Sequence, residues 1–185
     1  MLSNNCKVDR VEFESANIKS LPESVVQDLD RWMADRFRSY VWRLSPDEAD
    51  VDFVIARRGG KMIGRSAVVT RDVLVDGAPL RIMGIAGVIV KEEFQGQGLG
   101  LELMEKSMEF VRRNPAPFCI LMCNRELGKL YEKLGFREIP GQNAVFDQPN
   151  GSRPEYKPQH GITMVYEKVG HTWPGGLLDL HGLPF

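Results

Sequence analysis

Long apolar runs are missing from this chain of 185 residues, since none approaches the ~20 consecutive apolar residues that a membrane-spanning helix needs. The N-terminal stretch alternates polar and apolar residues and lacks the apolar segment of a secretion signal. An excess of one charge is missing too, because 24 Lys and Arg nearly balance 25 Asp and Glu, for a formal net charge of −1. A whole-chain basic field that would attract nucleic acid is therefore absent. We expect neither nucleic acid nor a membrane as a partner.

Cysteine and histidine are scarce, with three residues of each. Cys6 stands alone near the start, and Cys119 and Cys123 fall in the apolar run FCILMC. This odd number offers no disulfide framework, and the scattered His residues supply no zinc spacing. We therefore expect a reduced, cytoplasmic protein without a bound metal.

The chain has little room for a second domain, because 185 residues is an ordinary size for one. Hydrophobic residues make up 43% and charged residues 26%, which is close to the average of globular proteins and argues against a disordered chain. We expect a single domain that spans residues 1–185, with a C-terminal tail, residues 170–185, that folds back on it.

The first half of the chain has the period-two alternation that is typical of strands. Strands are predicted for residues 7–13, 52–58, 62–75 and 80–90. Gly59-Gly60 and Asp76-Gly77 are typical two-residue hairpin turns, so the later strands are sequential and antiparallel. Between the first two strands, apolar residues at helical spacing predict a helix that ends near Phe37, with Ser20 as a candidate cap.

Helical spacing returns in the second half. An amphipathic helix is predicted for residues 98–113, a buried strand for 118–122, and a further helix from Asn124 to Gly135. Residues 140–160 are rich in Pro, Gly, Asn and Gln, which predicts a long loop before a last strand at 162–169. Antiparallel strands followed by β-α-β-α indicate an α/β fold with a mixed, mostly antiparallel central sheet flanked by helices.

The most informative stretch is VIVKEEFQGQGLG, residues 88–100, between a predicted strand and a predicted helix. Gly96, Gly98 and Gly100 remove side chains from the turn, and the helix that follows offers unpaired N–H groups and the positive end of its dipole. Such a turn binds phosphate or pyrophosphate through its backbone. The alternative is a tight strand–helix turn without a ligand. The spacing differs both from a P-loop, which needs Gly-Lys-Ser/Thr, and from the Rossmann fingerprint.

Two segments carry a family resemblance. Gln95 to Gly100, QGQGLG, resembles the acyl-CoA pyrophosphate signature (Arg/Gln-x-x-Gly-x-Gly/Ala) of the GNAT superfamily of N-acetyltransferases. Asn124 to Phe136, NRELGKLYEKLGF, resembles a second motif of that superfamily, Asn…Leu-Tyr-x-x-x-Gly-Phe. The motifs come in the family's order, separated by a predicted helix and strand. The predicted elements from residue 7 to residue 169 are also similar to the family fold, so the resemblance covers most of the chain and implies a GNAT-like acyl-CoA N-acyltransferase fold.

The resemblance implies acetyl-CoA as the co-substrate and assigns its contacts residue by residue. The pantetheine arm would pair with the strand backbone of Val88, Ile89 and Val90. Asn124 would bond the pantetheine or pyrophosphate region. The pyrophosphate would be held by the signature residues, which are Gln95, Gly96, Gln97, Gly98, Leu99 and Gly100.

Tyr131 matches the family tyrosine that protonates the departing CoA thiolate. A phenol with a pKa near ~10 keeps its proton at neutral pH and can donate it to sulfur. The alternative is that Tyr131 only packs its ring on a buried helix face. Many relatives carry a carboxylate base on the strand before the loop, whereas residues 85–90 have none here, and Glu92 and Glu93 follow only in the turn.

The C-terminal tail is apolar and aromatic, and residues 173–179, WPGGLLD, resemble the Trp-Pro-x-Gly-x-Leu-Ile-Asp ending of the nodulation N-acyltransferases. The layout of the chain is also similar to that of the aminoglycoside 2′-N-acetyltransferases. By this resemblance, Asp179 and the terminal carboxylate of Phe185 would line the acceptor pocket, attract an amino-sugar ammonium and supply the missing base. The alternative is a tail that only covers a sheet edge.

Together these features predict an enzyme that transfers an acetyl group from acetyl-CoA to a primary amine of a small molecule, such as an amino sugar or an aminoglycoside, by direct attack in a ternary complex. Two alternatives stay open: a transferase with a longer acyl donor, and a non-catalytic acyl-CoA-binding module that kept the fold. Pocket shape selects the acceptor, and sequence does not reveal it. Dimers are common in the superfamily, so the resemblance also makes a homodimer an expectation.

Overall fold

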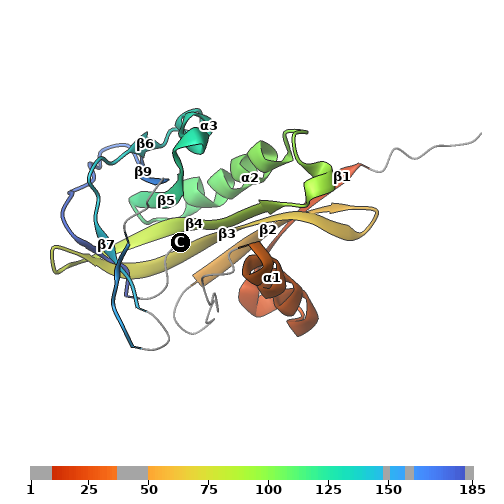
Figure 1. Ribbon diagram of the computed structural model, residues 1–185, viewed down its shortest axis with the longest axis horizontal. Helices are drawn as coiled ribbons and strands as arrows, with labels where there is room; N and C mark the ends of the chain where they lie inside the picture. The colour runs from red at the N-terminus through yellow and green to blue at the C-terminus, as the bar shows by residue number, and fades with distance from the viewer. Residues whose placement is uncertain (1–9, 37–49, 148–150, 157–160, 182–185) are drawn as a thin grey trace, which may run out of the picture.

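The computed structural model describes residues 10–36, 50–147, 151–156 and 161–181 of the chain. Within these residues, strands join in one ten-stranded sheet that has helices on both faces (Figure 1). The elements in chain order are β1 (Val11–Asn17), η1 (Ile18–Ser20), α1 (Glu23–Arg36), β2 (Asp50–Arg58), β3 (Lys61–Val75), β4 (Ala78–Val90), η2 (Glu92–Phe94), α2 (Leu99–Arg113), β5 (Phe118–Asn124), η3 (Arg125–Leu127), α3 (Gly128–Glu132), β6 (Arg137–Glu138), β7 (Ala144–Val145), β8 (Glu155–Tyr156), β9 (Gly161–Glu167) and β10 (Leu178–Asp179), where η marks a short 3₁₀ helix.

The centre of the sheet is built from strands that follow one another in sequence. β1 pairs antiparallel with β2, β2 with β3, and β3 with β4. β4 then pairs parallel with β5, which pairs antiparallel with β9, and β6 lies on the other side of β9. The predicted α/β fold with a mixed, mostly antiparallel sheet flanked by helices is therefore confirmed.

The helices divide between the two faces of the sheet. α2 and α3 lie on one face and α1 lies on the other (Figure 1). α2 buries Leu103, Met104, Met108 and Val111 at helical spacing, which confirms the predicted amphipathic helix. α1 buries Leu29 and Met33 against the opposite face. None of the helices within the described ranges has the length and apolar character that crossing a membrane requires.

The tail that follows β9 packs into the core on the α1 face of the sheet. The ring of Trp173 lies edge-on against Phe118, with ring centroids 5.2 Å apart. Leu178 and Leu180 are fully buried, and β10 pairs antiparallel with β3 and parallel with β7. Phe185, to which the sequence assigned an acceptor-facing carboxylate, lies outside the described residues.

The start of α1 differs from the one predicted from the sequence. Ser20 belongs to η1, where its hydroxyl donates to the carbonyl of Asn17 (2.7 Å) instead of capping α1. The first bond of α1 goes to the carbonyl of Pro22, whose fixed φ suits the start of a helix. The cap prediction was wrong because a serine also satisfies a local turn, and the spacing of apolar residues does not distinguish the two.

The segment predicted as one long loop, residues 140–160, contains the two-residue strands β7 and β8. These strands pair with each other, and β7 joins β10 and through it β3. A strand of two residues is too short to leave a period-two pattern, so neither strand has a signal in the sequence.

Candidate active site

β4 and β5 run parallel but stay paired over only a short distance. Their last paired residues are Gly84 and Ile120, although β4 continues to Val90 and β5 to Asn124. Parallel strands that separate in this way leave backbone N–H and C=O groups facing a gap, where an extended ligand can pair with them. Residues 88–90 of β4, which the sequence assigned to the pantetheine arm, are half-buried and lie along this gap.

A β-bulge in β4 lies beside the gap. Ser66 of β3 stands opposite two residues of β4, Gly87 and Val88, because the register shifts between the flanking pairs. Gly87 has a left-handed φ of +55°, and a Cβ at this position would lie 2.3 Å from the sulfur of Met33. Only glycine fits this bulge. The extra residue leaves a backbone N–H group of β4 outside the ladder, next to the place where the strands separate.

The loop between β4 and α2 has the shape of an anion-binding turn. Gly96 (φ +73°) and Gly98 (φ +84°) are left-handed, and a Cβ on either would meet nothing within 4 Å. Gln95 and Gln97 fold back over the loop and donate side-chain hydrogen bonds to carbonyls at the end of β4 (2.9 Å) and in η2 (3.2 Å). No backbone carbonyl of the described residues accepts a hydrogen bond from the N–H groups of residues 96–100. These donors, at the N-terminus of a 15-residue helix, fit a pyrophosphate.

Tyr131 lies in α3, the short helix that follows β5. Its side chain is 7% exposed and packs edge-on against Phe136, with ring centroids 6.3 Å apart. Burial, with a smaller effect from Cys123 at the end of β5, raises the pKa of Tyr131 to about 12. The phenol therefore keeps its proton at neutral pH, whatever its role. Asn124 is exposed at the end of β5 and precedes η3, so it lies on the β5 side of the gap.

Comparison with known proteins decides the family. A search of curated protein sequences found no significant match. The family model described as "Acetyltransferase (GNAT) domain" matches residues 23–139, from the start of α1 through the glycine loop and Tyr131. The chain belongs to the GNAT acetyltransferase family. It is accordingly an acetyltransferase, as the two sequence motifs predicted.

Solved structures, two of them of GNAT family acetyltransferases, share its fold. ElaA from Escherichia coli aligns with a TM-score of 0.66 at 19% identity, over 85% of this chain and 100% of that one. A GNAT family acetyltransferase from Brucella melitensis, in complex with acetyl-CoA, aligns with a TM-score of 0.63 at 17% identity, over 94% and 97% of the two chains. YhbS from Escherichia coli, in complex with CoA, aligns with a TM-score of 0.58 at 17% identity, over 93% and 90%.

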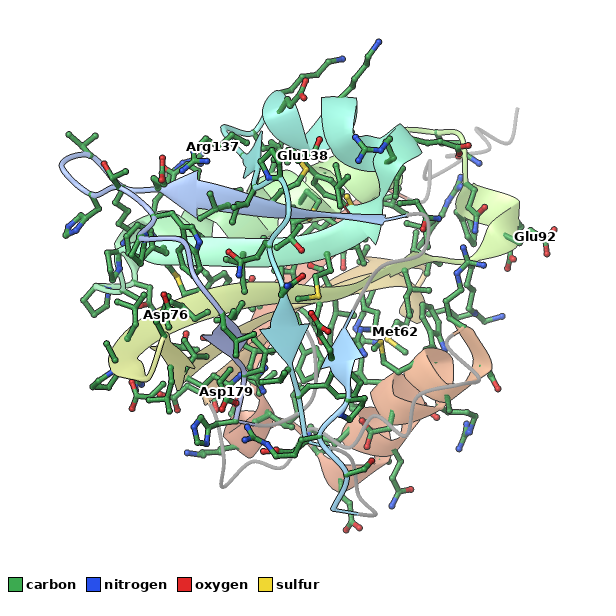
Figure 2. All side chains as sticks on the ribbon, turned by 60° about the vertical axis from the view of Figure 1, so that its left-hand side comes forward. Met62, Asp76, Glu92, Arg137, Glu138 and Asp179 are labelled. Carbon is green, nitrogen blue, oxygen red and sulfur yellow. The ribbon has the colours of Figure 1, made fainter. Side chains whose placement is uncertain are left out.

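The tail residue Asp179 lies at the other end of the sheet from the glycine loop of this GNAT domain. Figure 2 shows Asp179 and Asp76 near one end of the sheet, and Glu92, which follows β4, near the other. The Asp179 carboxylate accepts hydrogen bonds from Arg153 and from the N–H of His181 (3.1 Å). Although partial burial alone would raise it, these bonds hold the pKa of Asp179 below its usual range. The structure therefore does not bring Asp179 together with the predicted cofactor residues.

A pocket of about 310 Å³ lies beside the tail, lined by residues 139–143 and 175–177. Gln142 donates to the carbonyl of Gly176 (2.7 Å), and the next residue, Leu177, donates its N–H to Asp76 (2.7 Å). This pocket is therefore at the β3–β4 turn. It contains neither Tyr131 nor any residue of the glycine loop, and we assign no chemistry to it.

Sequence reasoning missed two residues on the α1 face of the site, Gly87 and Arg65. An isolated glycine within a strand pattern is a signal for a bulge, and the run IAGVIV contains one. Arg65 interrupts the run MIGRSAVV as its one charged residue, yet it is fully buried. A cation at a core position of a strand is rarely without a function or a partner, and that rule was the available signal.

Proposed function

We propose that this GNAT enzyme transfers an acetyl group from acetyl-CoA to the primary amine of a small molecule, by direct attack of the amine in a ternary complex. The observation that supports it is the gap between β4 and β5, because the two chemical parts of the site follow the ends of these strands. The loop with unpaired N–H groups follows β4, and the helix with Tyr131 follows β5. An extended donor in the gap would reach both.

The donor contacts follow from this placement. The backbone of Val88, Ile89 and Val90 would pair with the pantetheine arm, residues 95–100 would hold the pyrophosphate, and Asn124 would contact the donor from the β5 side. The residues fit such a group, because the loop N–H groups lack backbone partners and the glycine Cβ positions open onto empty space.

Acetyl-CoA supplies a thioester carbon at which the C–N bond to the amine forms as the C–S bond breaks. Tyr131 would donate its phenolic proton to the departing sulfur, since burial keeps that hydroxyl protonated. The free N–H at the Gly87 bulge would donate to the carbonyl oxygen as negative charge develops there. The proton that the attacking nitrogen loses would return to Tyr131 through solvent, which restores the phenol for the next turnover.

Water is the proposed first acceptor of that proton. β4 carries no carboxylate, and Glu92 and Glu93 are exposed in η2. An alkyl ammonium with a pKa near ~10 must lose its proton before attack. The rate of transfer should therefore increase as the pH rises toward the pKa of the acceptor ammonium.

The proposal also concerns the identity of the acceptor amine and of the acyl group. The tail resembles the nodulation N-acyltransferases, and the layout resembles the aminoglycoside 2′-N-acetyltransferases, which makes an amino sugar the first acceptor to test. In that case Asp179 would have to leave its ion pair with Arg153 to meet an ammonium. A longer acyl donor is the alternative within the same chemistry, and a non-catalytic acyl-CoA-binding module is the alternative outside it.

Release of CoA, followed with a thiol reagent, tests the proposal. We would offer acetyl-CoA with a panel of primary amines that includes amino sugars, polyamines and amino acids, and repeat active pairs with a long-chain acyl-CoA. Amine-dependent CoA release that requires Tyr131 supports the enzyme. Tight acetyl-CoA binding without release, over the whole panel, would favour the binding module.

A further inference from the structure

Arg65 is a cation in the core of the sheet. Its side chain is 0% exposed and lies between β3 and α1, where Nη1 donates to the carbonyl of Leu29 (3.1 Å). The guanidinium lies over the ring of Phe53, 4.9 Å from its centroid. Its Nε and Nη2 atoms are buried and have no hydrogen-bond partner in the part of the chain that the structure describes. Buried polar atoms are nearly always paired, so this edge of Arg65 needs an explanation.

The unpaired edge is the one with which an arginine holds a carboxylate. In Arg57, the Nε and Nη2 atoms donate to the two carboxylate oxygens of Glu14, at 3.0 and 2.9 Å. In Arg137, the same two atoms donate to the carboxylate of Glu167. Two parallel N–H donors at this spacing match the two oxygens of a carboxylate. Arg65 presents the same edge, fully buried and without an acceptor among the described residues.

Burial leaves the charge of Arg65 without a hydrogen-bonded counter-charge at this edge among the described residues. It lowers the pKa of Arg65 to about 10, although the charge of Asp30 in α1 acts in the opposite direction. The guanidinium therefore stays protonated at neutral pH. A buried charge is strongly unfavourable unless it is paired and hydrogen-bonded, and a ligand carboxylate would supply both the opposite charge and two acceptors.

Arg65 also lies next to the reacting part of the site. A Cβ built on Gly87 would be 2.8 Å from Nη2 of Arg65 and 2.3 Å from the sulfur of Met33. The guanidinium is therefore directly below the bulge, on the α1 face, whereas α2 covers the opposite face (Figure 1). Met33 reaches the same point beside Gly87. Its side chain is unbranched and flexible, so a change of rotamer would open this edge of Arg65 to a ligand.

We propose that Arg65 binds the carboxylate of the acceptor, so that the enzyme acts on small primary amines that also carry a carboxylate. This proposal rests on the acetyl transfer proposed above and narrows its substrate class. Amino acids and amino sugars with an acidic group fit, whereas polycationic amines without one do not. The bidentate edge would fix the acceptor on the α1 face and hold its amine beside the bulge at Gly87.

Two substitutions separate this role from a structural one. Arg65→Met removes the charge and the two donors at similar length, and Arg65→Lys keeps the charge without the planar edge. Arg65→Met should have a Tm equal to or above that of the wild type, because replacing a buried unpaired charge with an apolar side chain is neutral or stabilising. Arg57→Met is the matched control, since it removes a bidentate arginine whose carboxylate is Glu14.

The first measurement compares kcat/KM for carboxylate-bearing amines with that for their carboxamides. The wild type and Arg57→Met should prefer the acids by about 10-fold or more. Arg65→Met should lose this preference and Arg65→Lys should keep part of it, while the affinity for acetyl-CoA by calorimetry stays constant in all variants. The same preference in Arg65→Met as in the wild type, or none in the wild type, would overturn the proposal.

The second measurement does not depend on turnover. The Nε–H proton resonance of Arg65, assigned by its loss in Arg65→Met, should shift when the CoA-bound protein is titrated with a carboxylate-bearing amine. The matching carboxamide and sodium chloride should leave it in place. A resonance that does not move for any acid overturns the proposal, and failure to bind acetyl-CoA would instead overturn the acetyl transfer on which it rests.

Discussion

At the scale of the residue, the ring of Tyr131 packs in the core, and its hydroxyl is the proposed proton donor to the CoA sulfur. Tyr131→Phe keeps the ring and removes the proton donor, so the fold should survive while the single-turnover rate of acetyl transfer falls by ~10² or more. Tyr166→Phe is the matched control, because Tyr166 packs against the same Phe136 without a proposed role. If chemistry in Tyr131→Phe proceeds at the rate of the control, Tyr131 is not the acid.

The same tyrosine gives a prediction for alkaline pH. Burial raises the pKa of Tyr131 to about 12, against ~10 for an exposed phenol, so the folded protein binds more protons than the unfolded chain between these values. The contribution of Tyr131 to stability is thus complete below pH ~10 and disappears as the pH rises through the folded pKa. A phenolate absorbance titration should show one late step that is missing in Tyr131→Phe. Identical titrations of the two proteins would contradict this.

At the scale of the element, the loop before α2 depends on a backbone that only glycine adopts without strain. Gly98→Ala and Gly77→Ala place a methyl group at nearly the same φ, +84° and +81°, and both positions open onto free space. Each should lose about 1–2 kcal/mol of unfolding free energy for the left-handed conformation. Gly98→Ala alone should also weaken acetyl-CoA binding by about 10-fold or more, since the methyl group would occupy the place of the pyrophosphate.

Calorimetry on the two variants separates backbone strain from loss of the ligand site. Equal acetyl-CoA affinity in Gly98→Ala and Gly77→Ala would remove the pyrophosphate from this loop.

The tail element is held by Asp179, whose hydrogen bonds from Arg153 and His181 lower its pKa. Asp179→Asn should lower the Tm by on the order of 2 °C and leave the acceptor KM unchanged. In the wild type this contribution is complete above the unfolded pKa of ~3.9 and disappears as the pH falls through the folded value. Asp28→Asn, which breaks an exposed pair with Arg31, is the control and should not change the Tm.

Kinetic measurements distinguish a structural role of Asp179 in the tail from the acceptor-binding role predicted from the sequence. A raised acceptor KM in Asp179→Asn, with an unchanged Tm, would support Asp179 as a residue of the acceptor site.

At the scale of the whole molecule, donor binding should stabilise the entire fold, because the gap and the loop exist only in the folded chain. At a concentration 100 times its Kd, acetyl-CoA should add about 2.7 kcal/mol to the free energy of unfolding. For a chain of this size that corresponds to a Tm increase of roughly 5–10 °C by scanning calorimetry. Gly98→Ala should gain much less at the same concentration. A wild-type Tm that does not respond to acetyl-CoA would contradict the donor assignment.

The fold was predictable because its main elements are long enough to repeat their pattern. β3 and β4 show strand alternation over many residues, and α2 repeats its apolar stripe through four turns. The glycine loop was predictable for a different reason. Its conformation depends on three glycines at a strand–helix junction and on no distant residue.

The rest of the site depends on contacts between distant segments. The isolated glycine in β4 signals a bulge, but the residue of β3 that it faces depends on how the two strands pair. The burial of Arg65 depends on α1 covering β3, and arginines of strands more often extend to solvent. The partner of Asp179 is Arg153, in a connection that carries no periodic signal. Predicting any of these three features requires knowing how distant segments pair and pack in the folded sheet.

The pairing of β10 with β3 bears on how the nascent chain matures. Leu177 donates to Asp76 across 101 positions, and beyond Thr70 the outer edge of β3 pairs with β10 rather than with β2. During translation this edge of β3 is made about 100 residues before its partner strand, so it stays open until β10 has been made. Contacts of such long range form late and leave an unpaired edge exposed to other chains. Pairing of this part of β3 therefore waits for β10, and chaperone dependence in vivo should follow the integrity of β10.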